Sequence, residues 1–376
     1  MSLCTESDKL PAMNPSPTFP SAHLRKYLIA GYVLFIIYAS LSPFSGWQEQ
    51  GFKFSDVLAI PLWKQYSLFD VAANLLAYLP LGLLLGLTLR AWFGTFTTVI
   101  FATLISMILS AMMEYAQVYL PMRISSSLDI LSNSSGALLG ALLAVSIAPQ
   151  VWFAQHLSRW RMHLFHRGRK MDFGLALVAL WMSAQVNPSL PMLGNVFINQ
   201  IAQTPFAPAQ PAPFNLMESA AVALNLLMLG MLLLTLLRNR HHTVSALLLA
   251  LVLVALAKFV AAAVLLKSWA LLLWLNSEAI FGIVAGVALL VAAVRLPRVW
   301  ILKIAALVTV AYMIVANWIL DSGPPAIALP LYQRNYGHQL NFNGLSQSIT
   351  VILPFLILGY LWNIRRIRNA TGESPA

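Results

Sequence analysis

Residues 216–237 read LMESAAVALNLLMLGMLLLTLL, and residues 244–266 read VSALLLALVLVALAKFVAAAVLL. Both stretches are apolar on every face of a helix, whereas a helix at the surface of a water-soluble protein keeps a polar face. Each is also longer than the roughly 20 residues that a helix needs to cross the hydrocarbon layer of a bilayer. The two stretches therefore predict neighbouring transmembrane helices.

The composition extends this interpretation to the whole chain. Of 376 residues 59% are hydrophobic and only 9% are charged, against about 25% charged in a typical soluble domain. The lipid bilayer is therefore the expected surroundings of most of the chain. The single cysteine, Cys4, excludes an internal disulfide and a thiolate metal cluster.

Working outward from residues 216–266, apolar runs predict an all-α, polytopic bundle of about ten transmembrane helices. The predicted spans are Leu24–Pro43, Asp70–Leu89, Phe96–Tyr119, Leu128–Ala148, Phe173–Met192, Leu216–Leu237, Val244–Leu266, Trp269–Val294, Trp300–Leu320 and a short one at Ile349–Ile364. The predicted organisation is a disordered cytoplasmic tail (1–23), a four-helix unit (24–148), a basic cytoplasmic loop (149–171), a second and degenerate four-helix unit (172–294), two further helices (295–366) and a C-terminal tail (367–376).

The net charge of +11 is explained by topology. If the N-terminus is cytoplasmic and the spans alternate, seventeen of the 23 Lys and Arg residues lie on the inner side, as the positive-inside rule requires. They are Lys9, Arg25, Lys26, Arg90, Arg159, Arg161, Arg167, Arg169, Lys170, Arg238, Arg240, Arg295, Arg298, Lys303, Arg365, Arg366 and Arg368. Both termini are then cytoplasmic, and no nucleic-acid partner is expected.

Landmarks recur in the two four-helix units in the same order. Asn74-Leu-Leu is echoed by Asn225-Leu-Leu, and the pair Gly136 and Gly140 by Gly282 and Gly286. The recurrence indicates tandem repeats related by an axis along the membrane normal. Chance is the alternative, because small residues four apart are common where transmembrane helices pack.

The most informative feature is a set of polar residues at three span ends that all lie on the outer side. The set is Asp70, Asn74, Glu114, Gln117, Arg123, Asp129 and Asn133. Ionisable groups inside a membrane are costly, so their convergence predicts an outward-facing polar pocket that binds a substrate, with Gly136 and Gly140 admitting a neighbouring backbone below it. Glu114 and Asp129 are the candidate catalytic residues. The alternative is that the aspartates only cap helix N-termini.

A second buried pair is expected between Lys258 and Glu278. A tight turn near Lys267 would place the two side chains at nearly equal depth, where each would stabilise the charge of the other. A structural ion pair and a role in proton or substrate movement both remain open. No metal site and no cofactor is predicted, because the chain lacks the nucleotide-binding, dinucleotide-binding and zinc-protease motifs.

Taken together, Asp70-x-x-x-Asn74, Tyr78-Leu-Pro80-Leu-Gly82, Glu114-x-x-Gln117, Arg123 and Asp129-x-x-x-Asn133-x-x-Gly136-x-x-x-Gly140 resemble the signature of VanZ-like membrane proteins over about Leu24–Ala148. The resemblance implies a protein of the bacterial cytoplasmic membrane that acts on the cell envelope, and the founding member is associated with resistance to the glycopeptide teicoplanin. In the second unit Leu275 and Ala279 stand where Asp129 and Asn133 stand in the first, so any activity is expected in the first.

Three functions remain open at this point. The polar residues could bind or modulate a lipid or a lipid-linked cell-wall or polysaccharide precursor, with Arg123 pairing an anionic group. They could form a membrane-embedded hydrolase or transferase. Lys258 and Glu278 could instead serve a proton-coupled transporter. The sequence identifies neither the substrate nor the oligomeric state.

Overall fold

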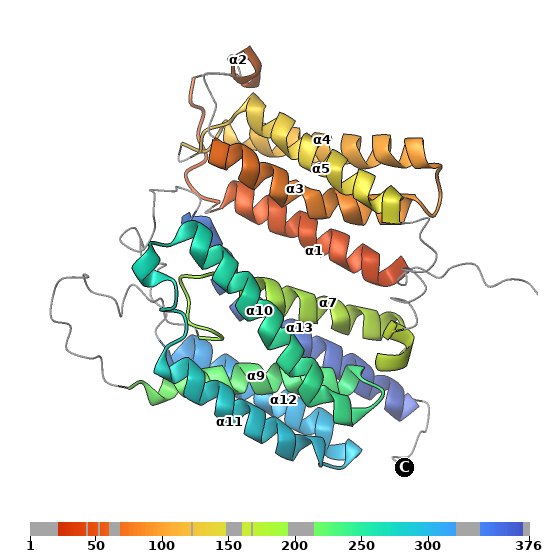
Figure 1. Ribbon diagram of the computed structural model, residues 1–376, viewed down its shortest axis with the longest axis vertical. Helices are drawn as coiled ribbons and strands as arrows, with labels where there is room; N and C mark the ends of the chain where they lie inside the picture. The colour runs from red at the N-terminus through yellow and green to blue at the C-terminus, as the bar shows by residue number, and fades with distance from the viewer. Residues whose placement is uncertain are drawn as a thin grey trace, which may run out of the picture.

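The computed structural model describes residues 22–42, 44–51, 53–59, 68–121, 123–147, 160–166, 168–194, 214–320 and 339–370. Residues 1–21 of the predicted N-terminal tail, residues 149–159 and 167 of the predicted basic loop, and residues 371–376 of the predicted C-terminal tail lie outside these residues. The described part is a bundle of helices that run roughly parallel or antiparallel to one another (Figure 1).

The helices follow the chain in the order α1 (Ala22–Leu41), α2 (Phe54–Ala59), α3 (Leu68–Leu89), α4 (Thr95–Gln117), α5 (Ser127–Ile147), α7 (Arg169–Ala184), α9 (Leu216–Leu236), α10 (Thr243–Leu265), α11 (Ser277–Val294), α12 (Arg298–Ile314) and α13 (Gln339–Ala370). Two short 3-10 turns precede α10 and α11 (Arg240–His242 and Ser268–Ala270), and one π-helical stretch continues α12 (Val315–Ile319).

Nine of the described helices are long and apolar enough to cross a membrane, which makes the chain a polytopic helical membrane protein. The predicted span Phe173–Met192 is not among these nine and corresponds to α7, which has 16 residues and a length of about 24 Å at 1.5 Å per residue. The short predicted span at Ile349–Ile364 lies within the much longer α13, which continues through Pro354.

The first four long helices, α1, α3, α4 and α5, form the N-terminal half of the bundle (Figure 1). Its tightest packing lies between α3 and α5, where glycines of each helix face the backbone of the other. A Cβ on Gly136 would overlap the carbonyl oxygen of Leu75, and one on Gly82 would overlap that of Ala137. The hydrophobic effect does not draw helices together in lipid, and close van der Waals contact between backbones stabilises the helix pair instead.

The C-terminal half, α7 and α9–α13, is organised around α9. Helices α7, α10, α11 and α12 all contact it, and Leu226, Met231 and Leu236 have no exposed surface. Gly282 and Gly286 of α11 lie against the backbone of Ser219 and Ala223. Helix α9 therefore faces protein on all sides, and its even apolarity reflects a protein core.

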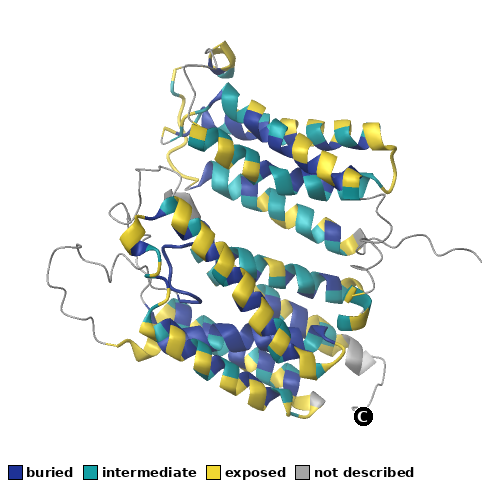
Figure 2. Ribbon diagram, in the orientation of Figure 1, coloured by how far each residue is buried: buried dark blue, intermediate teal, exposed yellow. Residues whose placement is uncertain are grey.

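Helix α7 ends at Ala184, eight residues before the end of the predicted span at Met192. Pro188 and Pro191 explain the early end. Helical geometry is disfavoured for the residue before a proline, and proline has no N–H to donate to a helical hydrogen bond. The chain then continues without regular structure to Gly194, and nearly every residue of this segment is buried (Figure 2). We call residues 185–194 the buried segment.

The two halves meet through α1, which packs against α7 and α13. The ring of Tyr27 contacts that of Phe173 edge-on, with centroids 5.4 Å apart, and the hydroxyl of Ser348 donates to that of Tyr38 over 3.4 Å. Within the N-terminal half, α1 makes most of this interface. Helices α3, α4 and α5 lie on the side of α1 that faces away from the C-terminal half (Figure 1).

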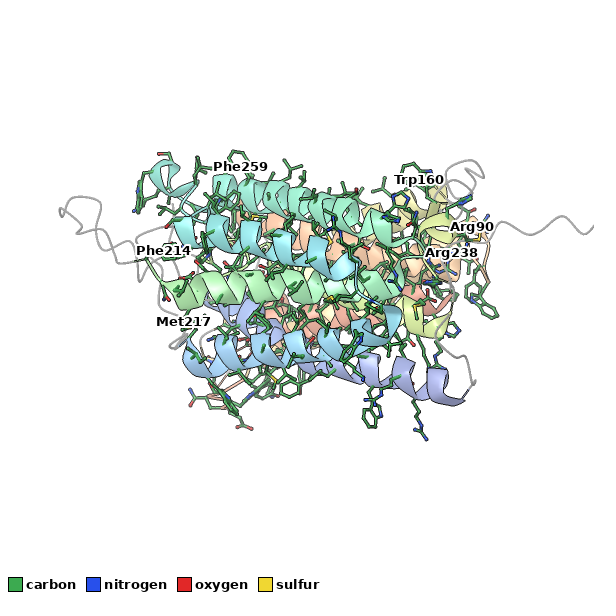
Figure 3. All side chains as sticks on the ribbon, turned by 90° about the horizontal axis from the view of Figure 1, so that it is seen from below. Arg90, Trp160, Phe214, Met217, Arg238 and Phe259 are labelled. Atoms are coloured by element: carbon green, nitrogen blue, oxygen red, sulfur yellow. The ribbon has the colours of Figure 1, made fainter. Side chains whose placement is uncertain are left out.

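Basic residues gather at one end of the bundle. Arg90 and Arg238 lie at this end together with Trp160, whereas Phe214 and Met217 lie at the opposite end (Figure 3). Helix α1 begins and α13 ends at the basic end (Figure 1). We call it the basic end, and the other the apolar-loop end.

Candidate functional site

The ends of α3, α4 and α5 that carry the predicted site residues meet at the apolar-loop end of the bundle (Figure 1). Asp70 lies in the first turn of α3, Glu114 and Gln117 in the last turn of α4, and Asp129 in the first turn of α5. The antiparallel course of α4 between two parallel neighbours therefore brings residues far apart in sequence to one place. We call this group the polar cluster.

Glu114 is the most enclosed acid of the polar cluster, with 4% of its surface exposed. Its Oε2 accepts a hydrogen bond from the backbone N–H of Ser126 over 2.8 Å, and its backbone carbonyl accepts one from the hydroxyl of Ser125 over 2.9 Å. Both serines belong to the loop before α5. The carboxyl and the backbone carbonyl of Glu114 thus fasten the α4–α5 loop to the end of α4.

Asp129 and its neighbours form the other side of the cluster. The amide of Asn74 hydrogen-bonds the Asp129 carboxylate, and Asp70 lies close enough for the two aspartate charges to interact. The charge of Asp129 also acts on Glu114. Three carboxyl groups therefore gather at this end of the bundle, and each one that is ionised contributes to a negative field there.

Asn133 lies one turn below Asp129 and is 6% exposed. Its Nδ2 donates to the hydroxyl of Ser110 over 2.9 Å, and Tyr78 is buried close to Ser110 and Glu114. The sequence did not single out Ser110 or Ser126. Serine is ordinary in membrane helices, and only the spacing of four between Ser110 and Glu114 would have placed both on one helix face.

Gln117 and Arg123 connect this end of α4 and the following loop to α1. Gln117 donates to the carbonyl of Ser40 over 3.0 Å, and Arg123 donates to those of Ala39 and Ser42 over 2.7 and 3.3 Å. Burial lowers the pKa of Arg123 and the charge of nearby Glu114 raises it. Arg123 therefore satisfies the last carbonyls of α1 and balances part of the negative field.

The loop before α3 passes over this end of the cluster. The backbone N–H of Gln48 donates to the carbonyl of Tyr119 over 2.9 Å, and the side chain of Gln50 donates to that of Val118 over the same distance. The ring of Phe54 in α2 contacts Tyr115 edge-on at 5.8 Å. These contacts tie the loop to the end of α4.

The predicted ion pair between Lys258 and Glu278 is not formed. Helix α10 ends at Leu265 and α11 begins only at Ser277, so the connection is far longer than a tight turn and Glu278 lies in the first turn of α11, near the membrane surface. Lys258 is fully buried and donates to the carbonyls of Gln185 and Pro191 over 3.0 and 3.4 Å.

Glu278 has other partners. Its Oε1 accepts from the backbone N–H of Asn215 over 3.2 Å and its Oε2 from the hydroxyl of Ser277 over 2.8 Å. The ion pair found among the described residues joins Arg161 and Asp172 at the basic end. Among all the residues that the structure describes, no three His, Cys, Asp or Glu side chains come together as a metal site requires.

Residues 25–153 match the model of the VanZ/LLP1 family. This range covers the N-terminal half of the bundle and every residue of the polar cluster, so the chain carries a VanZ-like domain there. No curated protein and no solved structure matches the chain significantly.

Proposed function

We propose that this VanZ-like protein resides in the bacterial cytoplasmic membrane and binds the head group of a lipid-linked cell-wall or polysaccharide precursor at the polar cluster. The observation that carries the proposal is the gathering of Asp70, Asp129 and Glu114 with Asn74 at one end of three helices. Such groups are rare in membrane helices because they are costly there, and they mark binding sites more often than other positions do.

The chemistry of the cluster favours a ligand that is rich in hydrogen-bond donors. Ionised carboxylates only accept hydrogen bonds, and Arg123 is engaged by the carbonyls of Ala39 and Ser42. A saccharide or an amine-bearing head group supplies such donors. Arg123 also positions α1 against the cluster through these carbonyls, and its pairing with an anionic group of the ligand stays a prediction.

The proposed orientation places the polar cluster outside the cell. The basic end carries both chain ends of the described bundle (Figures 1 and 3), and cytoplasmic loops are the ones enriched in Lys and Arg. A cysteine at Ile124, which is 90% exposed in the α4–α5 loop, tests this in a Cys4→Ser background. Labelling of intact cells by a membrane-impermeant thiol reagent supports the proposal, and labelling only after lysis would reverse the topology.

The function itself is tested with Asp129→Asn. Lipid and cell-wall precursors, and susceptibility to teicoplanin, are compared between wild-type cells, cells lacking the protein and cells with the variant at equal protein level. Asp129→Asn is expected to reproduce the deletion. The matched control is Asp56→Asn, an exposed aspartate of α2, which is expected to match wild type. Identical profiles in wild-type and deletion cells would refute an envelope role.

A hydrolase or transferase is the second candidate, favoured by the proximity of Glu114 to Asp129. Two carboxyl groups in different surroundings suit general acid and base roles. Glu114→Gln separates the candidates. An enzyme loses turnover at normal protein level and still binds its substrate, whereas a binding protein keeps a weakened function.

A further inference from the structure

A buried acid in the C-terminal half has no place in the proposed site. Glu218 lies in the first turn of α9, is 2% exposed, and no donor from the described residues reaches its Oε1. The atom instead faces the buried segment: a Cβ on Gly194 would lie 2.9 Å from it and 2.9 Å from the Cβ of Pro191. This oxygen therefore lies against Gly194, at the end of the buried segment.

The charged groups around Glu218 do not neutralise it. Glu278, from α11, is the charge that acts on it, and that charge is also negative. Lys258, from α10, binds the carbonyls of Gln185 and Pro191. Asp172, the acid of α7, lies in the first turn of that helix at the basic end, where it pairs with Arg161. In α12, Lys303 lies over the ring of Trp300 near the helix start, also toward the basic end.

The sequence adds that residues 195–213, which connect the buried segment to α9, contain no charged side chain. With respect to the residues that the structure describes, an ionised Glu218 would thus be a buried carboxylate beside a second carboxylate, with no cation as a partner. Such a charge costs far more than a buried neutral acid. From this geometry we propose that Glu218 is a proton-binding site of the C-terminal half, and that the bound proton allows the buried segment to close over α9.

The N-terminal half supports the assignment by its packing. Gly136 lies against the carbonyl of Leu75, and Gly282 lies against that of Ser219. When these contacts are superimposed, Asn74 and Glu218 occupy corresponding positions, one residue before the contacted carbonyl. The N-terminal half thus has a neutral amide where the C-terminal half has an acid, and a protonated glutamate is the neutral counterpart of an amide.

Infrared spectroscopy of the purified protein tests the proposal directly. A protonated carboxyl group has a C=O stretch that is distinct from the bands of ionised carboxylates and shifts in heavy water. At neutral pH, the difference spectrum between wild type and Glu218→Gln is expected to contain this band. Glu278→Gln is the matched control, and apart from the glutamine amide bands common to both variants its difference spectrum is expected to contain carboxylate bands and no protonated-carboxyl band. A carboxylate band for Glu218, or the protonated band for Glu278, would overturn the proposal.

A second measurement does not depend on assigning bands. A group that is protonated in the folded state and ionised in the unfolded state makes stability fall as pH rises. The melting temperature of wild type relative to Glu218→Gln is therefore expected to fall from pH 5 to pH 8, a range chosen to span roughly the ordinary carboxyl pKa to above neutrality. A difference that is constant or rises over this range would contradict the proposal.

Discussion

The two halves of the bundle share one type of helix contact, but this contact lies in different surroundings in each half. In both, a pair of glycines four residues apart on one helix lies against the backbone of another, α5 on α3 and α11 on α9. In the N-terminal half this contact supports three carboxyl groups at the apolar-loop end of the bundle. In the C-terminal half this contact lies within a protein core. Of the residues in the most apolar stretch of α9, 83% are buried, against 17% for α3. Close packing alone therefore does not identify the functional half.

The largest expected effect comes from adding one methyl group to the N-terminal contact. Gly82→Ala places a Cβ onto the carbonyl of Ala137, which is backbone and cannot move aside. We expect α3 and α5 to separate and stability to fall by more than about 4 kcal/mol. Monodispersity and melting temperature in detergent measure this.

The corresponding change in the C-terminal half should be milder. A Cβ on Gly230 meets the side chain of Leu290 at 2.7 Å, and a leucine can change rotamer, so Gly230→Ala is expected to cost about 1–3 kcal/mol. Gly31→Ala is the control, because nothing lies within 4 Å of that position. Equal losses for Gly82 and Gly230 would remove the distinction between backbone and side-chain contact.

Buried asparagines sharpen the comparison next. Asn225 accepts from the indole N–H of Trp181 over 2.8 Å and donates to the carbonyl of Leu193 over 3.2 Å. Asn225→Leu leaves both partners buried and unpaired, at about 1–3 kcal/mol each. Asn133→Leu leaves only Ser110 without its donor and should cost about half as much. Chemical or thermal unfolding, followed by Trp fluorescence, compares the two, and a larger loss for Asn133 would contradict the account.

Lys258→Met is expected to have a smaller and more local effect. The carbonyl of Gln185 loses its donor, at about 1–3 kcal/mol, while Pro191 keeps the N–H of Gly194 and the cost of a buried ammonium is removed. We expect a net loss of about 1–2 kcal/mol.

Hydrogen exchange of the amides of the buried segment reports the same change. It should quicken in Lys258→Met and stay unchanged in the N-terminal half. Lys267→Met, at an exposed position just beyond the same helix, is the control, and unaltered exchange of the buried segment in Lys258→Met would show that the ammonium does not hold it.

Glu278→Gln has the smallest expected effect, within about 0.5 kcal/mol. The amide oxygen of glutamine can still accept from the backbone N–H of Asn215, and its NH2 group can donate to the hydroxyl of Ser277, which then acts as the acceptor. A loss above about 3 kcal/mol, as for removal of one member of a buried ion pair, would instead restore the predicted pairing with Lys258. The measurement is the melting temperature of Glu278→Gln beside that of Lys258→Met.

Most of the helices could be predicted because hydropathy and length report directly on membrane spans, whatever the helices contact. The ends of the helices were less accessible. Helix α7 stops at Ala184, whereas the predicted span continues to Met192, and the signal for that stop is the pair Pro188 and Pro191 within a partly polar sequence. The N-cap residue Asn276, whose side chain accepts from the N–H of Ala279, likewise indicated the late start of α11.

The polar cluster was foreseeable because its acids are the few charges retained in three neighbouring spans. Glu218 was missed for the opposite reason, since one acid near a span end reads as a helix cap until its surroundings are known. The sequence alignment of Asn74 with Asn225 also differs from the packing, which pairs Asn74 with Glu218. Contact geometry settles such a register, and sequence similarity over two or three apolar residues does not.

The enclosure of α9 also constrains how the protein is made. This helix leaves the ribosome before α10, α11 and α12, which later cover it. The nascent α9 must therefore first be surrounded by lipid or by the insertion machinery, and then exchange those neighbours for side chains. Its uniform apolarity makes α9 stable in lipid as well as in the protein core. Assembly of the C-terminal half is complete only when the helices that cover α9 have been synthesised.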